Sequence, residues 1–258
     1  MPDMAPVRQG FMIAARHSQC RHAGDGCMEE AEFDRFADEY RAQHAANIRA
    51  SGESPEFFAD YKVAQVAAWL VGRYPAGPEI LDFGAGVGTS VPYFRKYLPH
   101  CRLTCLDVSR RSLELGRARF HDEAQFVQFD GSRVPFADAS FDLVFLAGVL
   151  HHVAHHEHAA LLAEIRRVLR GTGTLVVFEH NPYNPLTVHA VNSCPFDANA
   201  VLLTPRKLRR SAARAGFPRG VTQYRVFFPH ALRALRPLER AMRWLPLGAQ
   251  YSYHAARD

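Results

Sequence analysis

Residues 80–90 read ILDFGAGVGTS, an apolar run that ends in glycines spaced two apart. Because glycine has no side chain, it lets the backbone turn tightly and approach a ligand closely. A glycine-rich turn that opens a helix also directs backbone N–H groups at its ligand, which suits a nucleotide-like molecule. The candidate binding residues of this turn are Gly84, Ala85, Gly86 and Gly88.

Three further groups of residues follow predicted strands, at the edge of the sheet where parallel α/β proteins bind their ligands. Asp107 ends a strand at 102–107, where its carboxylate can accept hydrogen bonds from two ribose hydroxyls. Asp130 follows a strand at 124–129, where it can receive an adenine amino group. Small residues after a strand at 141–147 let a flat ring lie close. The binding residues predicted from these groups are Asp107, Val108, Asp130, Gly131, Ser132 and Ala147.

Side chains that could act on a second ligand gather after two later strands. The stretch VLHHVAHHEH holds five histidines, and His151 and His152 come first, next to the predicted ligand. An imidazole titrates near neutrality, so these two are candidate catalytic residues together with Glu179, which ends a strand at 173–179. The other three histidines are expected at the surface. No metal is expected, because the stretch lacks H-E-x-x-H and a helix should begin between the two histidines spaced four apart.

A long connection, residues 181–203, follows the strand at 173–179 and contains three prolines. Connections of this length at a ligand-binding edge usually hold substrate. The candidate substrate residues are His180, Asn181 and Asn184, joined by Tyr40 from the N-terminal part. The alternative is that the asparagines only satisfy backbone groups of an irregular segment.

These residues need a scaffold, and the chain beyond Pro78 predicts one. Apolar strands alternate with amphipathic helices, which indicates a parallel sheet covered on both faces. Predicted strands cover 80–83, 102–107, 124–129, 141–147 and 173–179, and predicted helices cover 89–98, 109–120 and 156–170, the last ended by Gly171. The tail adds a basic helix from Thr204 to Ala215, a strand at 220–228, a helix at 230–244 and a strand at 249–255. Its two strands predict a closing hairpin.

The part of the chain before this scaffold divides in two. Residues 1–28 are polar and weakly periodic, which predicts a flexible arm. Residues 29–75 show two helical patterns and are expected to form an N-terminal helical cap over the ligand. The predicted core is 76–258, with a substrate-side insertion at 181–203. From the cap, Tyr40, Tyr61 and Lys62 are expected to reach the ligand, with Tyr61 assigned to the cofactor.

In sequence order, the motif DFGAGVG, Asp107, Asp130 and the stretch FDLVFLAGVLHHV resemble the motifs of class I S-adenosylmethionine-dependent methyltransferases. The resemblance covers roughly residues 55–255 and is to the small-molecule type related to the ubiquinone-biosynthesis enzymes. It implies a three-layer Rossmann-like, doubly wound α/β sheet of seven strands whose last strand is antiparallel. It also implies S-adenosylmethionine as cofactor. The expected acceptor is a small molecule methylated at oxygen or nitrogen, such as a sugar-lipid precursor, a quinone-like ring or a secondary metabolite.

Other functions fit parts of the pattern. A nicotinamide-dependent dehydrogenase also has glycines followed by an acid, but its motif is G-x-G-x-x-G, whereas here the spacing is G-x-G-x-G and residue 89 is Thr. The same fold could bind S-adenosylmethionine and catalyse a different step, such as a cyclisation. A non-catalytic partner subunit is the remaining alternative, and the intact glycine and acid motifs argue against it.

Composition limits the partners. The net charge is +5 and much of the excess lies in residues 205–243, which could form a nucleic-acid face. Without interleaved aromatics or a recognisable binding module, a solvated helix surface is the favoured interpretation. The five scattered cysteines and the lack of a signal peptide indicate reduced thiols, hence a cytoplasmic protein. No apolar run approaches the length of a membrane span. A monomer or homodimer that binds no nucleic acid is predicted.

Overall fold

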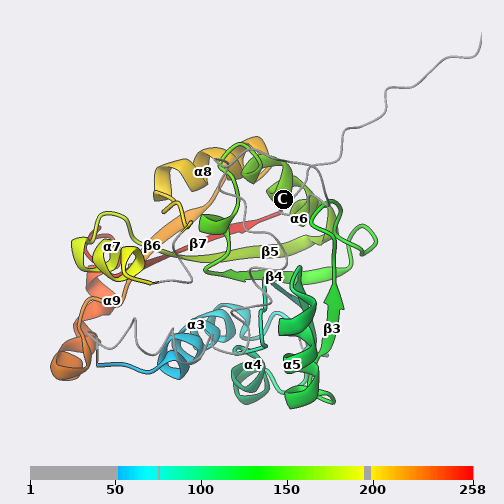
Figure 1. Ribbon diagram of the computed structural model, residues 1–258, viewed down its shortest axis with the longest axis horizontal. Coiled ribbons are helices and arrows are strands. Elements are labelled where there is room, and N and C mark those ends of the chain that lie inside the picture. The colour runs from blue at the N-terminus through cyan, green and yellow to red at the C-terminus, as the bar shows by residue number, and fades with distance from the viewer. Residues whose placement is uncertain (1–51, 75, 195–198, 258) are drawn as a thin grey trace, which may run out of the picture.

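The computed structural model describes residues 52–74, 76–194 and 199–257, so the predicted arm and Tyr40 lie outside the described residues. A seven-stranded sheet lies between two layers of helices (Figure 1). The strands are β1 (Glu79–Phe83), β2 (Arg102–Asp107), β3 (Gln125–Gln128), β4 (Phe141–Ala147), β5 (Leu169–His180), β6 (Val221–Arg225) and β7 (Gln250–Ala256). The helices are α3 (Pro55–Leu70), α4 (Val91–Tyr97), α5 (Arg110–Phe120), α6 (His158–Val168), α7 (Pro185–Asn192), α8 (Pro205–Arg214) and α9 (Glu239–Met242), with short 3-10 helices η2 (Leu150–His152) and η4 (His230–Leu238).

The strand order is β3-β2-β1-β4-β5-β7-β6. Strands β1 to β5 pair in parallel, and β7 runs antiparallel to both of its neighbours, β5 and β6. The predicted Rossmann-like sheet of seven strands with an antiparallel last strand is therefore confirmed. In the register of the sheet, Phe83 at the end of β1 lies beside Leu106 and Leu146. The carboxyl ends of β1, β2 and β4 thus lie level at one edge.

Both faces of the sheet are buried, as the continuous apolar strands predict. Helices α3, α4 and α5 cover one face and α6 and α8 cover the other (Figure 1). Alternating residues of one strand serve the two cores: on β4, Phe145 packs with Phe94 of α4, whereas Leu146 packs in the core with Leu161 of α6. This double packing fixes the strands that carry the candidate site.

Helix α3 is built into this scaffold. Its side chains Val63, Val66 and Leu70 are buried in the same core as residues of β1, β2 and β4. Ser54 caps the helix by accepting a hydrogen bond from the N–H of Phe57 at 3.4 Å. Of the cap predicted over 29–75, residues 52–74 lie within the described part of the chain and belong to a sheet-covering layer, and the division into cap and core stays a prediction.

Two of the predicted helices differ from the structure. Helix α6 ends at Val168 and β5 begins at Leu169, so Gly171 lies inside a strand and does not end the helix. The single helix predicted over 230–244 is instead the 3-10 helix η4 followed by the short α9. Pro237 cannot donate a backbone hydrogen bond, and Leu232 has non-helical backbone angles, so a continuous α-helix is interrupted.

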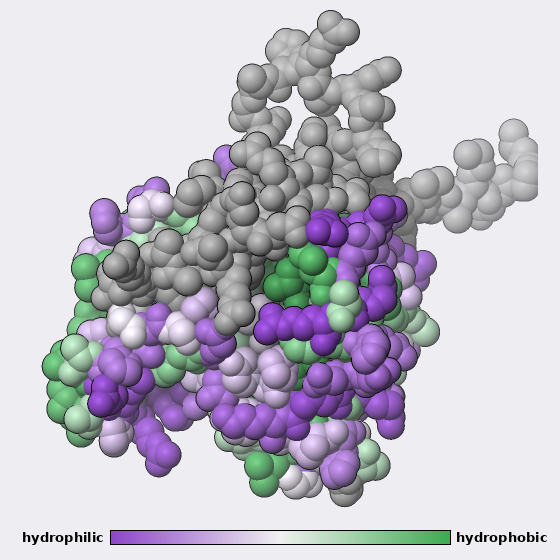
Figure 2. Space-filling model, turned by 60° about the horizontal axis from the view of Figure 1, so that its bottom comes forward, coloured by the Kyte–Doolittle hydropathy of each residue, from purple (hydrophilic) through white to green (hydrophobic). Residues whose placement is uncertain are grey.

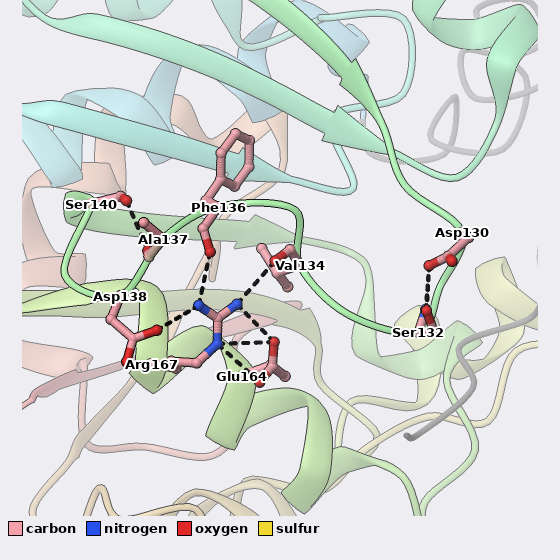
Figure 3. Close-up of polar contacts among 9 residues, drawn as sticks. All are labelled: Asp130, Ser132, Val134, Phe136, Ala137, Asp138, Ser140, Glu164 and Arg167. Carbon is pink, nitrogen blue, oxygen red and sulfur yellow. Dashed lines mark hydrogen bonds and ion pairs between the residues drawn. The ribbon is translucent and has the colours of Figure 1, made fainter. Parts of the chain in front are cut away.

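Arg167 of α6 holds the loop between β3 and β4 in place (Figure 3). Its guanidinium donates to the carbonyl oxygens of Val134 and Phe136, at 2.9 and 2.8 Å, and to the carboxylates of Asp138 and Glu164. Five donors in a planar fork suit such a convergence of acceptors. The loop that starts with the predicted adenine-side residues is thereby tied to the far layer of helices.

Among the described residues, no helix combines the length and apolar character that crossing a membrane requires.

Candidate active site

A cavity lies at the carboxyl edge of the sheet, between the turns after β1, β2 and β4 and the first turns of α3. Its predicted lining residues are Gly84, Ala85, Gly86, Asp107, Val108, Ala147 and His152. The other lining residues are Pro55, Phe58, Ala59, Lys62, Asp82, Phe83, Val87, Thr89, Ser90, Ser112, Phe129, Phe145, Gly148, Val149 and Val153. Residues from five separate segments therefore meet, and three of the predicted motifs are among them, namely the glycine turn, the Asp107 turn and the turn after β4.

The glycine turn has the backbone that its sequence demands. Gly84, Gly86 and Gly88 all have positive φ values, 72°, 53° and 76°, which side chains rarely adopt. A Cβ at Gly84 would lie 2.6 Å from Val149, so this glycine lets two turns pack together. A Cβ at Gly86 would meet nothing within 4 Å, because this residue faces the cavity. Gly88 is buried against Phe126 and does not line the cavity, so its part in cofactor binding stays a prediction.

Asp107 links the glycine turn to the next turn. One carboxylate oxygen accepts a hydrogen bond from the N–H of Gly86 at 2.7 Å, and the other accepts from the N–H of Ser109 at 2.9 Å. The side chain is 8% exposed and lines the cavity. A carboxylate fixed by backbone donors on one side can accept further hydrogen bonds on the other, since it has about four lone-pair sites. This geometry fits the predicted ribose contact.

Asp82 and Lys62 are two ionisable groups that line the cavity, and of these the sequence predicted only Lys62. Asp82 is 3% exposed, accepts a hydrogen bond from the hydroxyl of Ser90, and lines the cavity. Burial raises the pKa of Asp82 to about 7, against the opposing effects of Ser90 and Lys62. Burial also lowers the pKa of Lys62 to about 8. The signal for Asp82 was its place directly before the glycine turn, at the end of a buried strand.

The turns after β4 and β5 are joined by a buried network around Glu179. One carboxylate oxygen of Glu179 accepts from the N–H groups of Val149 and Leu150, at 3.1 and 2.8 Å. The other lies 2.6 Å from Nδ1 of His151. Burial alone would raise the pKa of Glu179, but His151, His180 and the N–H of Leu150 together hold it well below its usual value. Glu179 therefore positions the turn at 148–152 and does not line the cavity itself.

The predicted catalytic histidines take different places. His152 lines the cavity, whereas His151 is 3% exposed and lies behind it, against Glu179. The ring of His180 lies 5.3 Å from the ring of His151, which makes it part of the same cluster. His152 is thus the one of the three that reaches the cavity. His151 and Glu179 do not line the cavity, so a role of theirs in catalysis would act through the position of His152.

The remaining histidines of the stretch are structural or exposed. His156 is exposed, as expected, but His158 is 1% exposed and donates from Nε2 to the carbonyl oxygens of Leu150 and Val153, both at 2.9 Å. The expectation that His158 lies at the surface is wrong, because the ring ties α6 back to the turn before it. The described residues contain no group of three or more His, Cys, Asp or Glu arranged to hold a metal ion.

The predicted adenine-side residues lie next to the cavity rather than in its lining. Phe129 lines it, whereas Asp130 is exposed and its carboxylate accepts from the N–H and the hydroxyl of Ser132, at 2.9 and 2.5 Å (Figure 3). These hydrogen bonds lower the pKa of Asp130. Gly131 has φ 79° and allows the turn. The adenine contact of Asp130, Gly131 and Ser132 stays a prediction.

Of the two candidates on α3, Lys62 lines the cavity and Tyr61 does not, so the cofactor contact of Tyr61 stays a prediction. Tyr61 instead donates to the side chain of Gln250 and lines a second pocket with Phe57, Arg225 and others. Burial raises the pKa of Tyr61 far above its usual value.

The two predicted substrate asparagines bond to backbone groups. Asn181 is fully buried and donates to the carbonyl oxygens of Pro246 and Gly248, at 3.1 and 2.7 Å. Asn184 caps α7 by accepting from Leu186 and Thr187, and donates to the carbonyl oxygen of Leu247 at 2.7 Å. These contacts match the alternative in which the asparagines satisfy the backbone of an irregular segment. They fasten the substrate-side insertion to the chain before β7.

Comparison with known proteins shows which proteins this chain is similar to. Residues 81–177 match the family model described as a methyltransferase domain. The ubiquinone/menaquinone biosynthesis C-methyltransferase UbiE of Hahella chejuensis is 33% identical over 130 residues, 48% of this chain and 51% of the relative. The chain thus spans about half the length of the curated relatives it matches.

Solved structures show the same fold. A SAM-dependent methyltransferase from Thermotoga maritima aligns with a TM-score of 0.61 at 19% identity, covering 88% of this chain and 98% of the other. The trans-methyltransferase CalH, in complex with SAH, aligns with a TM-score of 0.57 at 21% identity, covering 78% of this chain and 58% of the other. Residues 81–177 therefore match a methyltransferase domain, and these structures share the fold of the chain. The resemblance to the ubiquinone-biosynthesis type and S-adenosylmethionine as the implied methyl donor are confirmed.

Proposed function

We propose that the protein is an S-adenosylmethionine-dependent methyltransferase that acts on a small, ring-containing acceptor of the quinone type. One observation carries this proposal. The glycine turn, Asp107 and His152 line one cavity within the residues that match a methyltransferase domain. Cofactor-side and acceptor-side groups therefore open onto a common space.

The residues present fit the cofactor. Gly86 leaves open the space that a side chain would fill, and Asp107 presents a fixed carboxylate beside it. S-adenosylmethionine, when bound, supplies an electrophilic methyl group whose leaving group is neutral. Alignment and exclusion of water then account for much of the rate, and the apolar lining from Phe58, Phe129 and Phe145 excludes water. His152 would take the proton that the acceptor loses.

The acceptor class is supported by two observations. Much of the lining is apolar or aromatic, which suits a flat ring better than a sugar. In addition, the curated relatives are named as C-methyltransferases of ubiquinone and menaquinone biosynthesis. Among the expected acceptors, a quinone-like ring is therefore favoured over a sugar-lipid precursor or another secondary metabolite. The relatives' name also adds carbon to the oxygen and nitrogen expected from the sequence.

Calorimetry and a methyl-release assay test the proposal. S-adenosylmethionine and its demethylated product should both bind, and isotopically labelled methyl should move to a hydroquinone in a panel that also holds phenols, amines and sugars. Nuclear magnetic resonance of the product then locates the methyl on carbon, oxygen or nitrogen. Failure to bind S-adenosylmethionine would overturn the proposal. Binding without transfer to any acceptor would favour the alternative of a different step, such as cyclisation.

The proposed base has a matched control. His152→Ala should lower methyl transfer by roughly 10²–10⁴-fold. Cofactor binding should change by less than about fivefold, because His152 lines the cavity from the turn after β4 and belongs neither to the glycine turn nor to the Asp107 turn. His156→Ala removes an exposed histidine, 83% of whose side chain is accessible, and should leave both quantities unchanged. A loss of only a few-fold in His152→Ala would mean that catalysis rests on alignment and that no base is used.

A further inference from the structure

The connection between β6 and β7 carries a concentration of exposed apolar surface. We call residues 229–247 the basic apolar segment; it contains η4 and α9. Of the ten large apolar side chains that are exposed in the described residues, five lie in this segment, namely Leu232, Leu235, Leu238, Trp244 and Leu247. Trp244 is 74% exposed and Leu247 is 61% exposed. Apolar side chains gathered in this way mark an interaction surface.

The same segment is strongly basic at its surface. It contains four arginines and one acidic residue, Glu239. Glu239 is turned to the protein, where its carboxylate accepts from the N–H groups of Phe227 and Phe228 at 3.0 and 3.1 Å. Within the described ranges, no acidic side chain forms an ion pair with Arg240 or Arg243. The charge that the segment presents is therefore positive.

The segment is held in a defined position. Arg236 forms an ion pair with Glu53 before α3, and its guanidinium lies 4.5 Å from the centre of the Phe57 ring. At the other end, the carbonyl oxygen of Leu247 accepts from Asn184 at 2.7 Å. Contacts at both ends make the exposed leucines and Trp244 part of a fixed surface.

This surface lies at the edge of the sheet that also holds the cavity. Strand β6 runs in the same direction as β1 and β5, so the chain leaves β6 at the carboxyl edge. Exposed Tyr183 and Leu186, which flank Asn184, extend the apolar surface onto α7. At the left end of the molecule, where Figure 1 places α9, Figure 2 shows hydrophobic and hydrophilic residues side by side.

We propose that the basic apolar segment docks the protein on the surface of an anionic lipid bilayer. Trp244 and Leu247 would enter the interfacial region, where tryptophan is favoured because its ring is apolar and its N–H is polar. Arg240 and Arg243 would meet the anionic headgroups. Each basic residue near such a surface strengthens binding by about fivefold, which corresponds to about 1 kcal/mol.

Charge complementarity combined with exposed apolar side chains favours lipid over nucleic acid. Helix α8 offers the contrast, because it exposes Arg206, Lys207, Arg209 and Arg210 while its leucine, Leu208, is buried. A nucleic acid needs only basic side chains, so α8 and the basic apolar segment would bind it equally well. A bilayer also needs apolar side chains to insert, and only the basic apolar segment provides them.

Sedimentation of the full chain with vesicles tests the proposal. Binding to phosphatidylcholine vesicles that contain phosphatidylglycerol should exceed binding to pure phosphatidylcholine vesicles by at least tenfold and should weaken in high salt. The chain has two tryptophans, and Trp69 lies against His254 with 4.4 Å between their rings. In Trp69→Phe, the fluorescence of Trp244 should therefore shift to the blue on binding and be quenched by quenchers placed in the bilayer.

Variants separate the docking surface from charge in general. Arg240→Glu with Arg243→Glu, and separately Trp244→Ala with Leu247→Ala, should each weaken vesicle binding by at least tenfold. Arg209→Glu with Arg210→Glu makes the same change in net charge on α8 and should weaken it less than threefold. Binding of S-adenosylmethionine should be unchanged in all three, which shows that they fold.

Three results would overturn the proposal: no vesicle binding by the full chain, equal losses in the α8 control, or loss of RNA binding in these variants without any vesicle binding. Because vesicle binding is measured without an acceptor, failure of the proposed methyl transfer leaves this test unaffected. A protein that binds vesicles but transfers no methyl would contradict only the proposed function.

Discussion

The turns after β1 and β2 and the turns after β4 and β5 lie at the same edge of one sheet, and both carry buried acidic side chains. In the first pair, Asp82 and Asp107 line the cavity. In the second pair, Glu179 lies behind the cavity and accepts from two backbone N–H groups and His151. Asp82 and Asp107 thus present carboxylates to the cavity, although Asp107 also accepts from two backbone N–H groups, whereas Glu179 holds a turn without reaching the cavity.

The environments of the carboxylates follow from this difference. Within the described residues, Asp82 accepts from the hydroxyl of Ser90 and from no backbone N–H, and burial raises its pKa to about 7. Glu179 is as deeply buried, yet its partners hold its pKa well below the usual value. Asp82 and Glu179 are thus about equally buried, but the environment of Asp82 favours the protonated form and that of Glu179 favours the charged form. Three variants test whether the two pairs of turns do divide in this way.

The largest effect is expected on the side of β4 and β5. Glu179→Ala leaves the N–H groups of Val149 and Leu150 and the ring of His151 without their acceptor, and should lower the free energy of unfolding by about 3–5 kcal/mol. Urea unfolding measures this loss. Glu179→Gln should cost less, because the amide oxygen can still accept from both N–H groups. A loss below about 1 kcal/mol in Glu179→Ala would remove the distinction between the two pairs of turns.

The next effect concerns the cofactor. Asp107→Ala should weaken binding of S-adenosylmethionine by about 2–4 kcal/mol, because it removes a charged acceptor that the ribose hydroxyls would use. Titration calorimetry measures the change. Asp130→Ala, which removes an exposed carboxylate, should cost less than about 1 kcal/mol. Equal losses at the two positions would show that the cofactor extends further toward β3 than the cavity does.

Measured per pH unit, the smallest effect is a dependence on pH. The pKa of Asp82 is about 7 in the folded protein against an ordinary value of 3.8. Between about pH 4 and pH 7, the folded carboxyl therefore holds a proton that the unfolded one has released. The contribution of Asp82 to the free energy of unfolding should fall as the pH rises through this window, by up to about 1.4 kcal/mol per pH unit.

Asp82→Asn provides the comparison for this slope. Denaturation of both proteins at several pH values isolates the contribution of the one carboxyl, and the difference between them should vary only within the window. Lys62→Met sharpens the test, because Lys62 lowers the pKa of Asp82 and its loss should extend the slope to higher pH. A difference that does not vary with pH would mean that Asp82 is charged in the folded protein.

The scaffold and the cofactor side could be predicted because their signals are local. An apolar strand followed by DFGAGVG requires positive φ values that only glycine adopts readily, and the structure has them at all three positions. The order of strand and helix along the chain fixes which turns meet at one edge. For this reason Gly84, Gly86 and Asp107 were placed at the cavity from their positions alone.

The features that the sequence did not predict depend on packing between residues far apart in the chain. Whether Tyr61 or Lys62 faces the cavity is set by the rotation of α3 on the sheet, which its sequence does not determine. His158 and Asn181 look alike as polar residues near the site, but each is buried by contacts that only the folded chain creates. Gly171 favours a helix end by local preference, yet pairing with β4 makes its neighbourhood a strand.

The place of β7 in the sheet sets an order in which the chain can fold. Strand β6 has β7 as its neighbour, and β7 joins it to β5. During synthesis, β6 and the residues after it therefore leave the ribosome before the strand they must pair with exists. The parallel strands up to β5 can pair first, although the free edge of β5 and the core beneath α6 are completed only by β7 and α8. Throughout that interval the exposed leucines and arginines of residues 229–247 are without a docked sheet beneath them, and they are the part of the nascent chain that a chaperone would meet.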